Sequence, residues 1–232
     1  MSGPRIGAVT IGQAPRPDLV EPLLDRAAGT IEVLQVGALD GLTIDQLPAP
    51  ASRHGRGGQP GYPLTTRLRD GTPVTLDEAD LAPLVQQAVD RAEDAGTEVV
   101  LLLCAGGFLD VAARGTLIRP FDAAVARLHE LGAGALAVVV PYPGQADPAR
   151  RKWEAAGFRA TVVVGHPADL TLPADTGTLD AVVLDYVGHP SRDVEALRER
   201  TELPVVDLGA CGAEAAIAAA GMPLQRVAAA GR

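Results

Sequence analysis

The feature that most constrains the fold of this chain is a repeated alternation of short apolar runs with longer amphipathic segments. The apolar runs have the length of buried strands and fall at residues 6–10, 31–36, 98–103, 135–140, 159–164, 180–184 and 204–206. Segments with helical spacing of apolar residues lie between them, at residues 18–28, 77–95, 121–131, 148–156, 192–200 and 213–220. This alternation predicts an α/β protein with a mostly parallel sheet and helices on both of its faces.

One segment departs from this alternation. Asp70 and Gly71 form a turn pair between two short β-type runs, so residues 62–74 are predicted to form a β-hairpin. The preceding residues 48–60 are rich in Gly, Pro, Ser and Arg and are expected to form a mobile loop that could act as a lid.

Composition limits the partners that the protein could have. A chain of 232 residues can bury one large core or two small ones, and its net charge of -9 argues against nucleic acid or an anionic membrane surface as partner. The net charge does not exclude a small anionic substrate, because an acidic protein can still contain a local cationic pocket. The two cysteines lie far apart and the N-terminus shows no secretory signal, so we expect reduced thiols and a cytoplasmic protein. The apolar stretches are too short to span a bilayer.

The sequence lacks the usual signatures of cofactor chemistry. It contains no Gly-x-Gly-x-x-Gly fingerprint, no phosphate-binding loop with Gly-Lys-Ser/Thr, and no Gly-x-Ser-x-Gly turn. None of its four histidines pairs with another ligand type at metal-binding spacing. We therefore expect no cofactor and no metal.

Cys104 is the strongest candidate for a chemical role. It follows the apolar run 99–103 and precedes Ala105, Gly106 and Gly107, an order typical of a strand that ends in a thiol before a turn. Because ligands bind at the carboxyl ends of parallel strands, a thiol there is placed to act as nucleophile or proton carrier. The alternative is a buried cysteine that packs as a small apolar residue.

Other strand ends also carry polar or glycine-rich sequence, and they line one site if they converge. Backbone N–H groups and an arginine would hold a substrate carboxylate, and further polar side chains would close the site. The candidates for these binding roles are Thr10, Gly12, Gln13, Arg16, Arg67, Gly106, Gly107, Gln145 and Asp185. Tyr186 is the candidate proton donor beside Asp185.

Each of these candidates also has a structural interpretation. The segment 10–18 can be a turn in which Asp18 caps the following helix, Arg67 can be a solvated charge, and Tyr186 can be a packing residue. Cys211 begins an Ala-rich helix, where a thiol can be acidified, but tight packing of such helices favours a structural role.

Taken together, several segments of this chain resemble the AroM family of bacterial proteins over nearly its whole length. The segments are residues 10–16, 37–42, 66–71 and 102–106, Gln145 with Lys152 and Trp153, and residues 180–185 followed by Gly188. More remotely, the layout is similar to the aspartate/glutamate/hydantoin racemase superfamily. That resemblance implies two flavodoxin-like (Rossmann-like) subdomains with parallel sheets, related by a pseudo-twofold axis and separated by a cleft. We expect the first subdomain at residues 1–119, completed by the strand and helix of residues 202–232, and the second at residues 120–201.

The superfamily resemblance also implies a reaction without a cofactor, in which each subdomain presents one cysteine from a strand end. Cys104 stands where the first cysteine would be, and Tyr186 stands where the second would be. A free phenol is a weaker acid than a free thiol by roughly 1.5 pKa units, so a symmetric two-thiol racemisation is disfavoured. A reaction with one thiol fits better: decarboxylation, isomerisation through a thiol adduct, or elimination.

The sequence thus predicts a cofactor-independent isomerase, racemase or lyase acting α to a carboxylate or carbonyl, with Cys104 and Tyr186 as catalytic residues. Two alternatives remain open. One is a catalytically silent protein that binds a small carboxylate. The other is an acyl- or amide-transfer enzyme in which Cys104 attacks and His166 or His189 acts as base, which requires an imidazole within hydrogen-bond reach of the thiol. The expected partner is a small molecule, with a homodimer as a common outcome for such chains.

Overall fold

The computed structural model describes residues 4–50, 61–172 and 176–225. Its first parallel sheet has the strand order β2-β1-β5-β6. These strands are β1 (Arg5–Thr10), β2 (Glu32–Gly37), β5 (Val99–Leu103) and β6 (Thr116–Ile118). Register is set by pairs such as Thr10 with Leu103, which aligns the carboxyl ends of β1 and β5.

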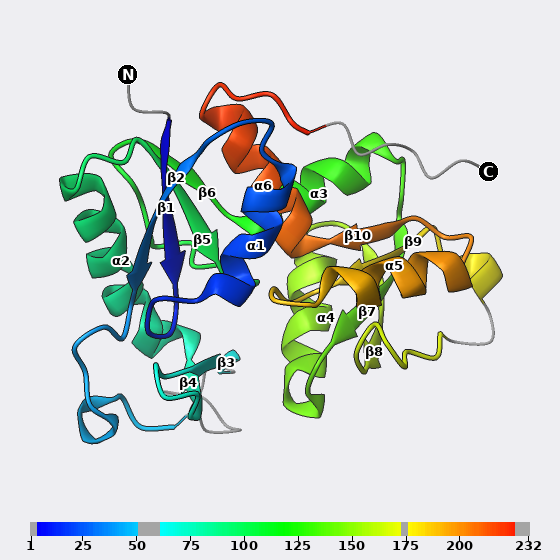
Figure 1. The fold of residues 1–232 in the computed structure, drawn as a ribbon. Helices are drawn as coiled ribbons and strands as arrows, with labels where there is room; N and C mark the ends of the chain where they lie inside the picture. Colours follow the sequence, from blue (N-terminus) through cyan, green and yellow to red (C-terminus); the bar gives the residue numbers. More distant parts are fainter. Residues whose placement is uncertain (1–3, 51–60, 173–175, 226–232) are drawn as a thin grey trace.

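The second parallel sheet has the order β10-β9-β7-β8. Its strands are β7 (Ala135–Val140), β8 (Arg159–Val164), β9 (Ala181–Leu184) and β10 (Val205–Asp207). The two sheets have the same topology when the strands of each are numbered in chain order. In both, the first strand lies between the second and the third, and the fourth pairs with the third at the edge. Figure 1 shows the sheets side by side, with α1 and α6 near the centre of the molecule. The expected fold of two parallel α/β units is confirmed.

Helices cover both faces of each sheet. On the first sheet, α2 (Glu78–Asp94) packs on one face, and α1 (Pro17–Arg26) with α6 (Leu208–Ala219) packs on the other. On the second sheet, α3 (Pro120–Glu130) and α4 (Ala146–Ala155) oppose α5 (Ser191–Arg200). Short 3-10 turns lie at Ile44–Gln46, Pro143–Gln145 and Thr176–Thr178. The four apolar clusters between these layers are built mainly from Val, Leu and Ala.

The hairpin is present as predicted. Strands β3 (Pro63–Arg67) and β4 (Pro73–Asp77) pair antiparallel, and Gly71 takes a φ of 88° at the turn between them. Of the expected loop at residues 48–60, residues 51–60 lie outside the described part of the chain.

Three details differ from the sequence-based expectations. Strand β6 was not predicted, and α6 begins at Leu208 instead of residue 213. The C-terminal strand was expected in the first subdomain, but β10 pairs with β9 of the second sheet. Backbone hydrogen bonds hold it there, among them the bond from Val182 N to the Pro204 carbonyl at 2.9 Å. Asp207 ends β10 and also caps α6, where its side chain accepts from Gly209 N at 2.9 Å. The chain therefore leaves the second sheet directly into a helix whose Ala216 and Ile217 pack on the first. The boundaries near residues 119 and 201 stay a prediction.

Within the described residues, no helix combines the length and apolarity that a membrane crossing requires.

Candidate active site

A cavity of about 320 Å³ lies between the two sheets. Residues after β1 and β5 and from the hairpin form one side of it, and residues after β7, β8 and β9 form the other. Six of the predicted site residues reach its wall: Thr10, Arg16, Arg67, Gln145, Asp185 and Tyr186. The strand ends therefore converge on one space, which is the condition that the sequence analysis set for a shared site.

Cys104 lies directly behind this wall. Its neighbours Leu103 and Ala105 line the cavity, while Cys104 is 4% exposed and packs in the apolar cluster that contains Leu64 and Phe108. The sulfur accepts a hydrogen bond from Gly106 N at 3.3 Å. Burial raises the pKa of the Cys104 thiol to about 12, so the thiol is protonated at neutral pH.

Beside Cys104 lies a buried ion pair whose role the sequence analysis did not predict. Lys152 Nζ donates to Asp185 Oδ1 at 2.6 Å and to the Ala105 carbonyl at 2.8 Å. Burial, the largest single influence, lowers the pKa of Lys152, but the Asp185 carboxylate and the Tyr62 hydroxyl together outweigh burial, so the pKa is raised and the ammonium persists. One signal was available: Lys152 is the only lysine in a chain that otherwise uses arginine for its basic residues.

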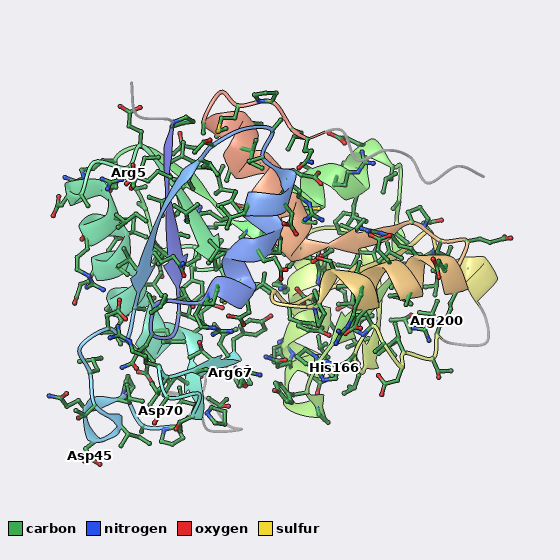
Figure 2. The ribbon with its side chains drawn as sticks, in the orientation of Figure 1. Arg5, Asp45, Arg67, Asp70, His166 and Arg200 are labelled. Atoms are coloured by element: carbon green, nitrogen blue, oxygen red, sulfur yellow. The ribbon has the colours of Figure 1, made fainter. Side chains whose placement is uncertain are left out.

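The two arginines that line the cavity differ in whether their guanidinium already pairs with a carboxylate of the protein. Arg16 forms a two-point contact with Asp18, Nε to Oδ1 at 2.8 Å and Nη2 to Oδ2 at 2.6 Å, which holds the pKa of Asp18 below its usual range. Asp18 thus pairs with Arg16 instead of capping α1, whose N-cap residue makes no side-chain cap bond. Arg67 is exposed, and its guanidinium makes no hydrogen bond or ion pair within the described residues, although its charge adds to that of Arg16 in lowering the pKa of Asp18. Figure 2 shows Arg67 at the hairpin and His166 on the side of the second sheet.

The predicted carboxylate cradle of backbone amides is not assembled at the cavity. Gly12 N donates to Thr10 Oγ1 at 3.3 Å, Gln13 N to the Arg67 carbonyl at 3.2 Å, and Gly106 N to the Cys104 sulfur. Gly107 N faces Glu78, a carboxylate that also accepts from Phe108 N at 2.7 Å. These N–H groups already have partners inside the protein, so in this arrangement those of Gly12, Gln13, Gly106 and Gly107 are not free to bind a substrate carboxylate.

The side chain of Gln13 likewise has partners inside the protein. Its Nε2 donates to the carbonyls of Leu39 and Leu42 at 3.0 and 2.9 Å, and its Oε1 accepts from Arg69 N at 2.8 Å. These bonds tie the loop after β2 and the hairpin to the end of β1. Gln13 therefore supports the hairpin that carries Arg67.

Gly12 permits the close approach of that hairpin. A Cβ atom at residue 12 would lie 2.4 Å from Thr66 Oγ1 and 2.5 Å from the Arg67 carbonyl oxygen. We expect Gly12→Ala to lower the free energy of unfolding by about 1–3 kcal/mol, because the hairpin backbone must move. Urea unfolding measures this, with Gly144→Ala as control, since a Cβ there meets nothing within 4 Å. Equal stability of the two variants would contradict the argument.

The wall formed by the second subdomain contains a chain of aromatic and imidazole rings. The Tyr186 hydroxyl lies 3.1 Å from His166 Nδ1, and the Tyr186 ring lies 3.9 Å from the ring of His189, centre to centre. His189 Nε2 is 3.6 Å from Asp207 Oδ1. Burial raises the pKa of Tyr186 and lowers that of His189, which disfavours the charged form of each.

Neither His166 nor His189 hydrogen-bonds to Cys104 in the described structure, where the thiol's partner is Gly106 N. The requirement stated for an acyl- or amide-transfer enzyme is therefore not met in this arrangement. The second thiol, Cys211, lies in the first turn of α6, where burial raises its pKa to about 12. The helix N-terminus does not acidify it, which agrees with a structural role.

Gln145 links the two sides of the cavity, because its Nε2 donates to the Pro63 carbonyl of β3 at 3.2 Å. Among the described residues, no group of three or more His, Cys, Asp or Glu side chains is arranged to hold a metal ion.

Solved structures with the same fold include three kinds of enzyme. A maleate cis-trans isomerase from Nocardia farcinica, with a covalently bound succinylcysteine intermediate, is 18% identical, with a TM-score of 0.60 over 96% of this chain and 94% of that one. An aspartate racemase from Picrophilus torridus is 13% identical, with a TM-score of 0.59 over 97% of both chains. An arylmalonate decarboxylase is 15% identical, with a TM-score of 0.60 over 94% of this chain and 93% of that one. At these identities the likeness establishes the fold.

No curated protein sequence matches the chain significantly. The family model described as AroM protein matches residues 6–212. The chain therefore belongs to the AroM family, as its sequence motifs indicated.

Proposed function

We propose that this AroM-family protein is a cofactor-independent lyase or isomerase that acts α to a carboxylate, with Cys104 as its reactive thiol. The observation that carries the proposal is the position of Cys104, directly behind the wall of a cavity that also holds the Arg67 guanidinium, for which the described residues provide no hydrogen bond or ion pair. The fold is shared with a maleate isomerase, an aspartate racemase and an arylmalonate decarboxylase, whose named substrates are all carboxylates. That likeness supports the general kind of reaction.

The protonated state of Cys104 favours the role of proton donor. When a malonate-type substrate loses CO₂, the electrons of the broken C–C bond remain on the α-carbon. The Cys104 S–H then gives its proton to that carbon, and the resulting thiolate recovers a proton from water. A thiol with a pKa raised to about 12 by burial holds this proton throughout the neutral range. Isomerisation through a thiol adduct requires the thiolate instead, and is the second candidate reaction.

The remaining residues of the wall have supporting roles in this proposal. Arg67 binds the substrate carboxylate, with Arg16 and Thr10 beside it. Tyr186, whose pKa is raised by burial, donates a hydrogen bond as a neutral phenol. Gln145 and Asp185 close the site from the second subdomain. The Cys104 thiol and the Tyr186 phenol are different acids, so they cannot act as the two equivalent groups of a symmetric racemase, and racemisation is not proposed.

The test is turnover of a substrate panel in D₂O, followed by proton NMR. Amino acids, hydantoins, malonates and dicarboxylates are incubated with the wild-type protein and with Cys104→Ala. Loss of an α-proton signal, conversion of a double-bond isomer, or release of CO₂ by the wild type alone would support the proposal. A ligand that raises the melting temperature without being converted would favour the silent carboxylate-binding protein, which the tyrosine at residue 186 makes the main alternative.

Arg67 offers a separate prediction about binding. A hydrogen bond to a charged group contributes about 1.5–3 kcal/mol, so Arg67→Met should raise KM by about ten- to a hundredfold with little change in kcat. The KM of Arg67→Lys should lie between those of the wild type and Arg67→Met, because lysine keeps the charge but loses the two-point geometry. Arg159→Met, in exposed β8 and outside the cavity, is the matched control. An unchanged KM in Arg67→Met would exclude this residue from carboxylate binding.

A further inference from the structure

We propose that Lys152 sets the acidity of the Cys104 thiol through the peptide unit that joins Ala105 to Gly106. The inference deepens the proposed function and rests on it, because the acidity of Cys104 matters for turnover only if this thiol takes part in the reaction. Lys152 is then a positioning residue that acts on the sulfur without touching it.

The contacts form a continuous chain from the ammonium to the sulfur. Lys152 Nζ donates to the Ala105 carbonyl oxygen at 2.8 Å. The N–H of the same peptide unit belongs to Gly106 and donates to Cys104 Sγ at 3.3 Å. A peptide whose carbonyl accepts from a cation becomes a stronger donor at its N–H, since hydrogen bonds in a chain polarise one another. The charge of Lys152 thus favours the thiolate.

The other charged and titratable groups around the thiol oppose this effect or are neutral. Glu78 from α2 and Asp185 after β9 both disfavour a negative sulfur, and they add to the effect of burial. Tyr62, beside β3, is a neutral phenol whose pKa burial raises further. Lys152, from α4, is therefore the cationic group that lowers the thiol pKa. Its removal should leave the thiolate without this cation, although burial then also favours the neutral form of Asp185, whose pKa it raises.

The position of the ammonium is fixed by its surroundings. Its side chain is 13% exposed, and the side chain of its partner Asp185 is fully buried. The Phe121 and Tyr62 rings lie 4.8 and 5.6 Å from Nζ, measured to the ring centres, and stabilise a cation at this place. A fixed charge beside the peptide suits a reaction in which the sulfur becomes negative only after it has given up its proton.

The test measures the reactivity of Cys104 directly and needs no substrate. In a Cys211→Ala background, iodoacetamide alkylation of Cys104 is followed by peptide mass spectrometry between about pH 7 and about pH 10. Because only the thiolate reacts, the rate follows the thiolate fraction. We expect Lys152→Met to slow alkylation about tenfold at each pH, which corresponds to about one pKa unit, and Lys152→Arg to stay within about threefold of the parent.

Glu78→Gln provides a second variant with the opposite sign. It leaves the Lys152–Asp185 pair intact and removes a carboxylate that disfavours the thiolate, so alkylation of Cys104 should become faster. Circular dichroism confirms that each variant is folded, and if Lys152→Met is unfolded, Lys152→Gln replaces it as the uncharged variant. A folded Lys152→Met or Lys152→Gln protein that reacts as fast as the parent, or a folded Glu78→Gln protein that does not react faster, would overturn the inference. Turnover by Cys104→Ala would instead refute the proposed function and leave these rates unaffected.

Discussion

Replacing Cys104 with alanine should lower turnover about 10²- to 10⁴-fold, the range that a positioned proton donor contributes. The reason is that the other thiol of the chain, Cys211, lies in α6, and the nearby phenol of Tyr186 is held in its neutral form by burial. Initial rates with the substrate found in the panel measure the loss. Cys104→Ser should be almost as inactive, because a hydroxyl is a far weaker acid than a thiol.

Two controls separate this loss from damage to the fold. Cys104 is small and packs among aliphatic side chains, so Cys104→Ala should unfold within a few degrees of the wild type. Cys211→Ala removes the second thiol, which does not line the cavity, and should keep the wild-type rate. A Cys104→Ala protein that retains a rate close to that of the wild type would refute the catalytic role of this thiol.

Replacing Trp153 with alanine should cost about 3–5 kcal/mol of unfolding free energy, the usual range for a fully buried tryptophan. Trp153 has no exposed surface, and its ring packs edge-on against Phe121 and Phe158, with centres 4.8 and 5.8 Å apart. It also precedes the end of α4 and directly follows Lys152, so its loss should loosen the helix that carries the ammonium. Unfolding must be followed by circular dichroism, because the chain has no other tryptophan to report by fluorescence.

The matched control for this change is Leu109→Ala. Leu109 is also a large apolar residue, but it is 85% exposed, so its truncation should change stability by less than about 0.5 kcal/mol. If Trp153→Ala cost no more than Leu109→Ala, the second sheet and α4 would not be held together by this aromatic cluster.

The sequence was sufficient to predict the layers and the strand ends that border the cavity, for a physical reason. Buried strands of a parallel sheet are continuous apolar runs, and the first polar or glycine-rich residue after each run marks its carboxyl end. Cys104 after β5 and Asp185 with Tyr186 after β9 were found in this way. Because both sheets have the same strand order, these third strands occupy equivalent positions.

Interactions between distant segments could not be predicted in the same way. The Lys152–Asp185 pair joins α4 to the end of β9, and the bond from Lys152 to Ala105 joins the two subdomains. Similarly, the glycine amides after β5 looked free in sequence, but Glu78 from α2 occupies part of that turn. Nothing in a linear pattern shows which buried polar groups satisfy one another, so the identity of the free carboxylate-binding group was uncertain. The proposed function assigns that role to Arg67.

The β10 strand illustrates the same limit on a smaller scale. Its three residues carry little periodicity, so they do not indicate the sheet to which the strand belongs. The structure shows that β10 pairs with β9 and that Asp207, its last residue, caps α6. The Asp-Leu-Gly sequence at residues 207–209 is typical of a helix N-cap, but this signal does not indicate which sheet the preceding strand joins.

The most direct measurement of the central claim is selective alkylation of Cys104 by bromoacetate, a reagent that is itself a carboxylate. Labelling of Cys104 and Cys211 is followed by peptide mass spectrometry, with neutral iodoacetamide as the comparison. If the cavity binds carboxylates beside a reactive thiol, bromoacetate will label Cys104 with saturation kinetics, dicarboxylates will protect it, and Arg67→Met will abolish the saturation. Labelling of Cys104 that never saturates, or a preference of bromoacetate for Cys211, would contradict the account.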